Sequence, residues 1–153
     1  MRFLALKIPP VLQVVVIGAA MYGVSKTMPA MRFSLAGSAW LGGAIAVTGL
    51  GIAVMGVTEF KNTQTTVNPQ TPEKSEHLVT SGVYRYSRNP MYVGLVFILF
   101  GWALYRSHAL AFALLPVFVI YMSRFQIQAE EKVMTQKFGE AYITYLSQVR
   151  RWL

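Results

Sequence analysis

Apolar residues are concentrated in four stretches of the chain, at positions 8–24, 35–57, 91–105 and 109–122. A helix needs roughly 17 to 25 apolar residues to cross a hydrocarbon core about 30 Å thick, and the first two stretches meet that requirement. The third and fourth are shorter and are divided only by residues 106–108, which predicts a tight helical hairpin with a thinned or partly shielded crossing. The pattern therefore predicts an all-α, polytopic membrane bundle of about four transmembrane helices.

The second apolar stretch is rich in glycine, at Gly42, Gly43, Gly49, Gly51 and Gly56. Small residues on a membrane helix allow a neighbouring helix to approach closely. We therefore expect this helix to pack centrally in the bundle.

The composition agrees with a membrane protein and limits its chemistry. Of the 153 residues, 54% are hydrophobic and 13% are charged, and the mean hydropathy is +0.44, which is too apolar for an ordinary soluble domain. The chain has no Cys and two His. We therefore expect neither a disulfide framework nor a metal site built from side chains.

Two polar regions complete the pattern. Residues 61–75 contain Thr and Pro and few apolar residues, which predicts a loop or lid. From Arg124 onward the chain is amphipathic, which predicts a C-terminal helix on the membrane surface, broken or bent at Gly139. The chain is predicted to form a single domain, residues 1–153, with two transmembrane helices in 1–58, a polar segment in 59–90, the hairpin in 91–123, and the amphipathic helix and tail in 124–153.

The basic residues are unevenly divided between the two sides of the predicted bundle. The chain has 14 Lys and Arg residues, and with both termini on one side only Lys26, Arg32 and Arg106 fall on the other. The positive-inside bias then makes both termini and the 59–90 segment cytoplasmic, in a multi-pass protein of the inner or plasma membrane. Topology and contact with membrane lipids explain the net charge of +8, and we expect no nucleic-acid partner because the basic residues form no continuous stripe.

The segment 78–94, LVTSGVYRYSRNPMYVG, leads directly into the third apolar stretch. It gathers two arginines, three tyrosines, an Asn-Pro step and two glycines at the bilayer surface. A connection between two membrane helices does not need these residues, so the segment predicts a binding site. Simpler roles remain open, because Tyr84 and Tyr92 suit an interfacial aromatic belt, Gly82 and Gly94 suit a turn and close packing, and Arg88 suits contact with lipid phosphate.

Two adjacent carboxylates, Glu130 and Glu131, follow the fourth apolar stretch. They raise the local negative charge at a surface that already favours cations, which suits a cationic ligand. A solvated helix face is the alternative explanation.

The 78–94 segment and the later EEKVMTQKFGEAYITY segment together resemble the isoprenylcysteine carboxyl methyltransferase family. The first signature of that family reads approximately Leu-Val-x-x-Gly-x-Tyr and then Arg-His-Pro-x-Tyr-x-Gly, and here Asn89 replaces its His. The second is a Glu pair followed by Phe-Gly-x-x-Tyr-x-x-Tyr. The resemblance covers residues 76–153, roughly half of the chain.

The resemblance implies a membrane methyltransferase that uses S-adenosylmethionine and a lipophilic acceptor. This donor carries a sulfonium, a carboxylate, an ammonium and an adenosine. Its amino-acid end needs side chains of opposite charge, and its adenine needs a wall on which to stack. By resemblance, the cofactor is bound by Glu76, His77, Leu78, Val79, Gly82, Tyr84, Arg88, Asn89, Pro90, Tyr92, Glu130 and Glu131. The resemblance also implies catalytic roles for Glu131 and Arg124 and substrate binding by Arg124, Tyr142 and Tyr145.

The sequence departs from the family pattern at two places. Glu76 occupies a position where the family often has His, and Gln126 and Ile127 stand where many members have Arg. These departures leave open an acceptor other than a prenylcysteine carboxylate. We favour a carboxylate or thiolate acceptor, because an amine must first lose a proton and the sequence offers no buried His for that step; phospholipid amines remain possible.

Two other functional classes are consistent with an apolar helical chain of this size. The first is a membrane reductase similar to the sterol reductases, which use a nicotinamide cofactor, NADPH. The second is a membrane scaffold without catalytic activity. The Glu pair and the ending YLSQVRRWL favour the methyltransferase.

Overall fold

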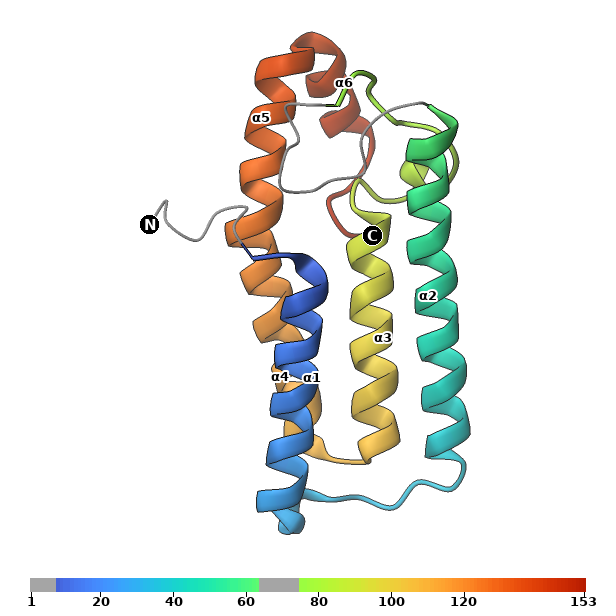
Figure 1. Cartoon of the computed structure of the whole chain (residues 1–153), viewed down its shortest axis with the longest axis vertical. Helices are drawn as coiled ribbons and strands as arrows, with labels where there is room; N and C mark the ends of the chain where they lie inside the picture. The colour runs from blue at the N-terminus through green and yellow to red at the C-terminus, as the bar shows by residue number, and fades with distance from the viewer. Residues whose placement is uncertain (1–7, 64–74) are drawn as a thin grey trace.

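The computed structural model describes residues 8–63 and 75–153, and these residues form an all-α bundle without β-strands (Figure 1). Residues 64–74 of the predicted 61–75 loop lie outside the described residues. The elements are α1 (Pro10–Thr27), η1 (Pro29–Met31), α2 (Ser38–Asn62), η3 (Gly82–Arg85), α3 (Pro90–Arg106), α4 (Ala109–Tyr121), η4 (Met122–Ile127), α5 (Gln128–Phe138) and α6 (Glu140–Gln148).

Three helical paths are long and apolar enough to cross a membrane, namely Pro10–Thr27, Ser38–Asn62 and Ala109–Phe138. The fourth, α3, has 17 residues and is one of the two short apolar helices that the sequence predicts. The other, at 109–122, belongs to the longer path Ala109–Phe138. The all-α membrane bundle is therefore confirmed.

Helix α3 occupies the middle of the bundle, with α2 along one side and α1 and α4 on the other (Figure 1). The expectation that α2 packs centrally is wrong, because α2 contacts α3 along one face and leaves large apolar side chains such as Trp40, Val47 and Leu50 exposed. Helix α3 instead carries small residues toward α2 and the buried side chains Tyr92 and Leu99 toward the core. Both of its faces are therefore covered.

Glycines allow the close contact between α2 and α3. Gly42, Gly49 and Gly56 are buried at intervals of seven residues on α2, and Gly94 and Gly101 oppose them on α3. A Cβ atom added at Gly49 would lie 2.5 Å from the carbonyl oxygen of Gly94. The backbones therefore approach too closely for any side chain at this position.

Replacing Gly49 by Ala is expected to destabilise the protein by about 1–3 kcal/mol, because the new methyl group overlaps backbone atoms of α3. Gly51→Ala is the matched control, since nothing lies within 4 Å of the added Cβ atom there. The measurement is thermal unfolding of the two detergent-solubilised variants. Equal melting temperatures would contradict the close helix contact.

Helix α4 continues without interruption into α5. The sequence pattern changes from apolar to amphipathic near residue 123, but the π-helical turn η4 carries the helix on to Phe138. Residues 124–138 therefore extend a membrane helix rather than start a separate surface helix (Figure 1). The predicted break at Gly139 is present, because this residue has φ +53° and separates α5 from α6.

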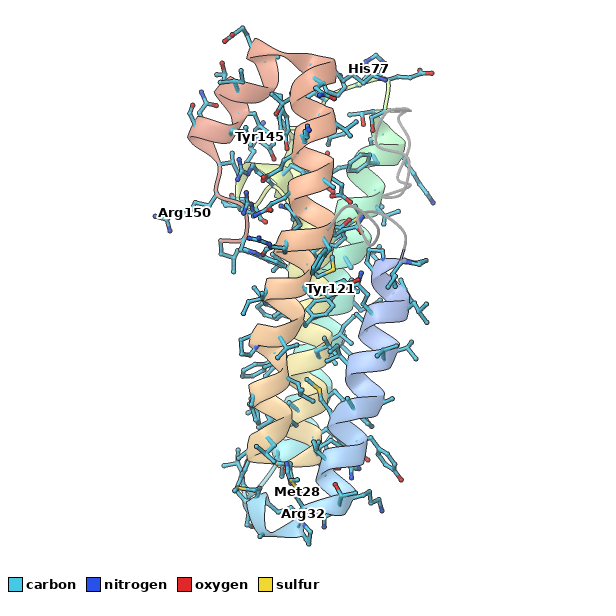
Figure 2. All side chains as sticks on the ribbon, turned by 90° about the vertical axis from the view of Figure 1, so that its left-hand side faces the viewer. Met28, Arg32, His77, Tyr121, Tyr145 and Arg150 are labelled. Atoms are coloured by element: carbon cyan, nitrogen blue, oxygen red, sulfur yellow. The ribbon has the colours of Figure 1, made fainter. Side chains whose placement is uncertain are left out.

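Polar groups gather at the two ends of the bundle. Figure 2 shows Arg32 at one end, His77 and Tyr145 toward the other, and Arg150 in the same half as Tyr145. The Glu pair and the segment before α3 belong to the second end, where α6 and the C-terminal tail fold back beside the start of α3 (Figure 1).

Candidate functional site

The segment before α3 forms a short 3-10 turn and then the start of the helix. Pro90 is the first residue of α3, a position where its missing N–H costs no hydrogen bond. The carbonyl oxygen of Asn89 accepts hydrogen bonds from the backbone N–H groups of Tyr92 and Val93 at 2.9 and 3.0 Å. The helix start therefore fixes the direction in which Tyr92 points.

Glu130 is bound by two neutral donors. The hydroxyl of Tyr92 and Nε2 of Gln126 both donate to its Oε1 atom, each at 2.6 Å. Tyr92 comes from the first signature segment and Glu130 from the second. The structure therefore brings the two segments together through a direct hydrogen bond.

Glu131 is bound by two arginines. Nη2 of Arg88 lies 3.1 Å from Oε1 of Glu131, and Arg151 donates from Nε to Oε1 at 3.0 Å and from Nη2 to Oε2 at 2.6 Å. The side chains of Arg88 and Glu131 are 11% and 14% exposed, whereas that of Arg151 is 34% exposed. The hydrogen bonds from Arg151 to Glu131 raise the pKa of the Arg151 guanidinium above its usual range.

The C-terminal tail is part of the same cluster. The backbone N–H of Arg88 donates to the carbonyl oxygen of Arg150 at 3.0 Å, and Nδ2 of Asn89 donates to that of Arg151 at 2.9 Å. Nε1 of Trp152 donates to Oγ of Ser123 at 3.0 Å. The tail therefore joins the start of α3 to the helix that carries the Glu pair.

Two tyrosines connect α6 to the 3-10 turn. The hydroxyl of Tyr145 donates to the carbonyl oxygen of Tyr84 at 2.7 Å, and the ring of Tyr84 packs edge-on against Phe60 with centroids 5.4 Å apart. Burial, followed by the proximity of Tyr145 and Glu130, raises the pKa of the Tyr84 phenol above its usual range. Its hydroxyl is therefore protonated, and it has no hydrogen-bond partner within residues 8–63 and 75–153.

Glu59 at the end of α2 holds the turn from the other side. Its Oε2 atom accepts a hydrogen bond from Oγ of Ser81 at 2.7 Å. The carboxylate occupies the space that a Cβ atom of Gly82 would need, and Gly82 has φ +55°. Glycine is therefore required here for both its conformation and its size.

A pocket of about 580 Å³ opens between the 78–85 segment and α6. This volume is within the usual range for small-molecule sites. Leu78 and Tyr145 line this pocket, whereas Glu130 and Tyr92 do not. The candidate site therefore has two parts, the pocket and the carboxylate cluster formed by Glu130, Glu131 and their hydrogen-bond partners. The lining residues are Leu78, Thr80, Arg85, Ala141, Thr144, Tyr145, Gln148 and Val149.

The remaining predicted residues are less closely connected. Glu76 and His77 are exposed, and Figure 2 shows His77 at the tip of the molecule. Val79 and Tyr142 are buried. Arg124 is exposed two helical turns before Glu131 and takes no part in the hydrogen bonds of the carboxylates within the described part of the chain. Its catalytic and substrate-binding roles stay predictions.

The expectation that the chain has no buried His is wrong. His108 is fully buried, and its Nε2 atom lies 2.8 Å from the carbonyl oxygen of Met28. It lies at the end of the bundle opposite the carboxylates, between α3 and α4, so it does not supply a base to this site.

A family of known proteins matches most of these helices. Residues 38–141 match the model of a family described as phospholipid methyltransferase. The chain belongs to this family. The match runs from the start of α2 into α6. It contains the whole 78–94 segment and residues 130–141 of the second signature segment, so the resemblance to a membrane methyltransferase is confirmed.

An uncharacterized protein of Haemophilus influenzae is also similar to the chain. It is 40% identical over 63 residues, which are 41% of this chain and the whole of that protein. No solved structure matches the chain.

Proposed function

We propose that this membrane methyltransferase family member uses S-adenosylmethionine to methylate a lipophilic acceptor that enters from the bilayer. The observation that carries the proposal is the contact between the two signature segments, through Tyr92 with Glu130 and Arg88 with Glu131. Four of the residues that the resemblance assigns to the cofactor, Arg88, Tyr92, Glu130 and Glu131, thus lie in one cluster. This end also holds the pocket between the 78–85 segment and α6.

The residues present fit the chemistry of this donor. Two buried polar groups, the hydroxyl of Tyr84 and Nε of Arg88, have no hydrogen-bond partner in the described part of the chain, and a polar ligand would supply one. We assign the ammonium group to Glu130, because one of its oxygens accepts both protein hydrogen bonds, whereas both oxygens of Glu131 bind arginine. Arg88 is the candidate partner of the carboxylate.

Leu78, Val79 and Tyr84 are the candidate wall for the nucleoside. Leu78 lines the pocket, and Val79 and Tyr84 are buried residues of the same segment. Glu131, with Arg88 and Arg151, braces the start of α3 against α5. When bound, S-adenosylmethionine supplies an electrophilic methyl group on a sulfonium, so the main task of the protein is to position the acceptor and exclude water.

We infer that the acceptor is a carboxylate or a thiolate. Attack of an anion on a sulfonium merges opposite charges, which a poorly hydrated site promotes without a strong base. Neither His is a buried base in this site, since His77 is exposed and His108 lies at the opposite end. A phospholipid amine, which the family description favours, is the second candidate.

Two experiments test this function. Calorimetric titration of the detergent-solubilised protein with S-adenosylhomocysteine and with NADPH should show binding of the first alone. Binding of NADPH alone would indicate the reductase, and binding of neither would favour the scaffold. Membranes incubated with methyl-labelled donor should yield base-labile methyl ester or a thioether product, whereas a base-stable N-methyl lipid would identify the amine acceptor.

The proposed cytoplasmic location of the site gives a separate prediction. Single cysteines introduced at Thr80 and Gln148, which are both exposed, should react with a membrane-impermeant thiol reagent only from the cytoplasmic side. A cysteine at Ser34, also exposed, should react only from the other side. The absence of native Cys makes the background low. Labelling of Thr80 and Gln148 variants from opposite sides would contradict a shared site.

A further inference from the structure

Three basic residues, Lys26, Arg32 and Arg106, gather around Tyr22 and Ser25 of α1. Figure 2 shows Arg32 at the end of the bundle away from Tyr145 and His77. The sequence contains no Asp or Glu in residues 1–58 or 77–129, which include all of this end. The three positive charges therefore have no acidic side chain from the surrounding segments to neutralise them.

The two arginines converge on one buried serine. Pro29 has no N–H, so the carbonyl oxygen of Ser25 lacks its usual helical donor, and Nη2 of Arg32 donates to it at 3.2 Å. Arg106 donates to Oγ of Ser25 from Nε at 3.0 Å and from Nη2 at 2.8 Å. Because Ser25 is fully buried, the two guanidinium groups are held at the same place on the surface of α1.

Contacts from the α3–α4 turn fix this arrangement. The backbones of Arg32 and His108 pair as an isolated β-bridge, and the N–H of Phe33 donates to the carbonyl oxygen of Ser107 at 3.0 Å. The imidazole of His108 in turn binds the carbonyl oxygen of Met28. The arginines are thus held close together by the fold, although two like charges repel each other.

Aromatic rings place the cluster at the depth of the lipid headgroups. The guanidinium carbon of Arg106 lies 4.9 Å from the ring centroid of Tyr22 and 5.8 Å from that of Trp102, and Nζ of Lys26 lies 5.7 Å from the Tyr22 centroid. Tyr and Trp are enriched where a membrane helix meets the headgroup region. A guanidinium has five N–H donors, and the contacts to Ser25 use only some of those of Arg32 and Arg106.

We propose that this cluster binds the phosphate of an anionic phospholipid at the membrane face opposite the methyltransferase site. Converging guanidinium groups match the oxygens of a phosphate, which neutralises the charge that the protein leaves uncompensated. A lipid is the favoured source because Met28 and Phe33, apolar and exposed, flank the arginines. The proposal does not depend on the proposed function, and it concerns the other end of the molecule.

Native mass spectrometry of the detergent-solubilised protein with equal amounts of phosphatidylglycerol and phosphatidylcholine tests the proposal. The wild-type protein should retain phosphatidylglycerol preferentially. The double variant Arg32→Gln/Arg106→Gln should reduce this preference roughly tenfold or more, since it removes the charge-assisted hydrogen bonds. Lys61→Gln at the opposite end removes one positive charge and should retain the preference.

If the Arg32→Gln/Arg106→Gln variant does not fold, Lys26→Gln takes its place, because the ammonium of Lys26 takes no part in the hydrogen bonds to Ser25. Loss of this ammonium should lower the preference for phosphatidylglycerol by a smaller factor. Equal retention of the two lipids by the wild-type protein would overturn the proposal. So would an equal loss of preference in Lys61→Gln, or displacement of phosphatidylglycerol by millimolar inorganic phosphate, which would identify a site for free anions. None of these outcomes depends on binding of S-adenosylhomocysteine.

Discussion

Replacing Glu131 by Gln is expected to lower the stability of the protein by about 3 kcal/mol, because it leaves Arg88 and Arg151 without their carboxylate partner. Loss of one member of a buried ion pair typically costs about 3–5 kcal/mol, and we take the lower end because the side chain of Arg151 is 34% exposed. The measurement is thermal unfolding in detergent. Binding of S-adenosylhomocysteine should fall as well, since the start of α3 loses its brace.

Glu140→Gln is the matched control for this prediction. It removes the same charge from an exposed position at the start of α6. Its melting temperature should remain near that of the wild-type protein. A Glu131→Gln variant that melts together with Glu140→Gln would show that the arginine contacts contribute little to the fold.

Replacing Glu130 by Gln should instead affect mainly the donor. Gln keeps the size of the side chain and an oxygen that accepts hydrogen bonds from Tyr92 and Gln126, so the effect on stability should be small. A hydrogen bond to a charged group contributes about 1.5–3 kcal/mol, which corresponds to a roughly ten- to over a hundredfold weaker binding of S-adenosylhomocysteine in calorimetry. If the contact is equally strong in the ground and transition states, KM for the donor rises while kcat changes little.

The two glutamate variants together test the division of roles. Unchanged affinity for S-adenosylhomocysteine in Glu130→Gln, with normal stability, would remove Glu130 from the proposed ammonium site. Tyr22→Ala, at the other end of the bundle, serves as a control for binding, and an equal loss of affinity there would point to a general effect on the fold.

Local patterns predicted the helices well, because each depends on neighbouring residues. The apolar stretches correspond to α1, α2, α3 and α4, and Gly139 ends α5 as expected. The continuation of α4 into α5 was missed, because the change of pattern at residue 123 resembles the start of a new element. The backbone nevertheless stays helical through the π turn.

The candidate site was predicted only in part, because local patterns do not reveal contacts between residues far apart in the sequence. The signature segments identified Tyr92, Glu130 and Glu131, but the binding partners Glu59, Gln126 and Arg151 were not assigned a role. Glu59 contacts a serine 22 residues away, and Arg151 contacts a carboxylate 20 residues away. Contacts of this kind depend on how α2, α5 and the C-terminal tail fold back, which spacing along the chain does not reveal.

The continuous helix from Ala109 to Phe138 also sets the depth of the Glu pair in the membrane. With a rise of about 1.5 Å per residue, Glu130 lies roughly 32 Å along the helix axis from Ala109, close to the hydrocarbon thickness of about 30 Å. The helix that crosses the lipid therefore also places the carboxylates at the water boundary. A change in bilayer thickness would tilt this helix and raise or lower the site relative to the headgroups. We therefore expect the methyltransferase activity to depend on lipid chain length even when every contact in the site is preserved.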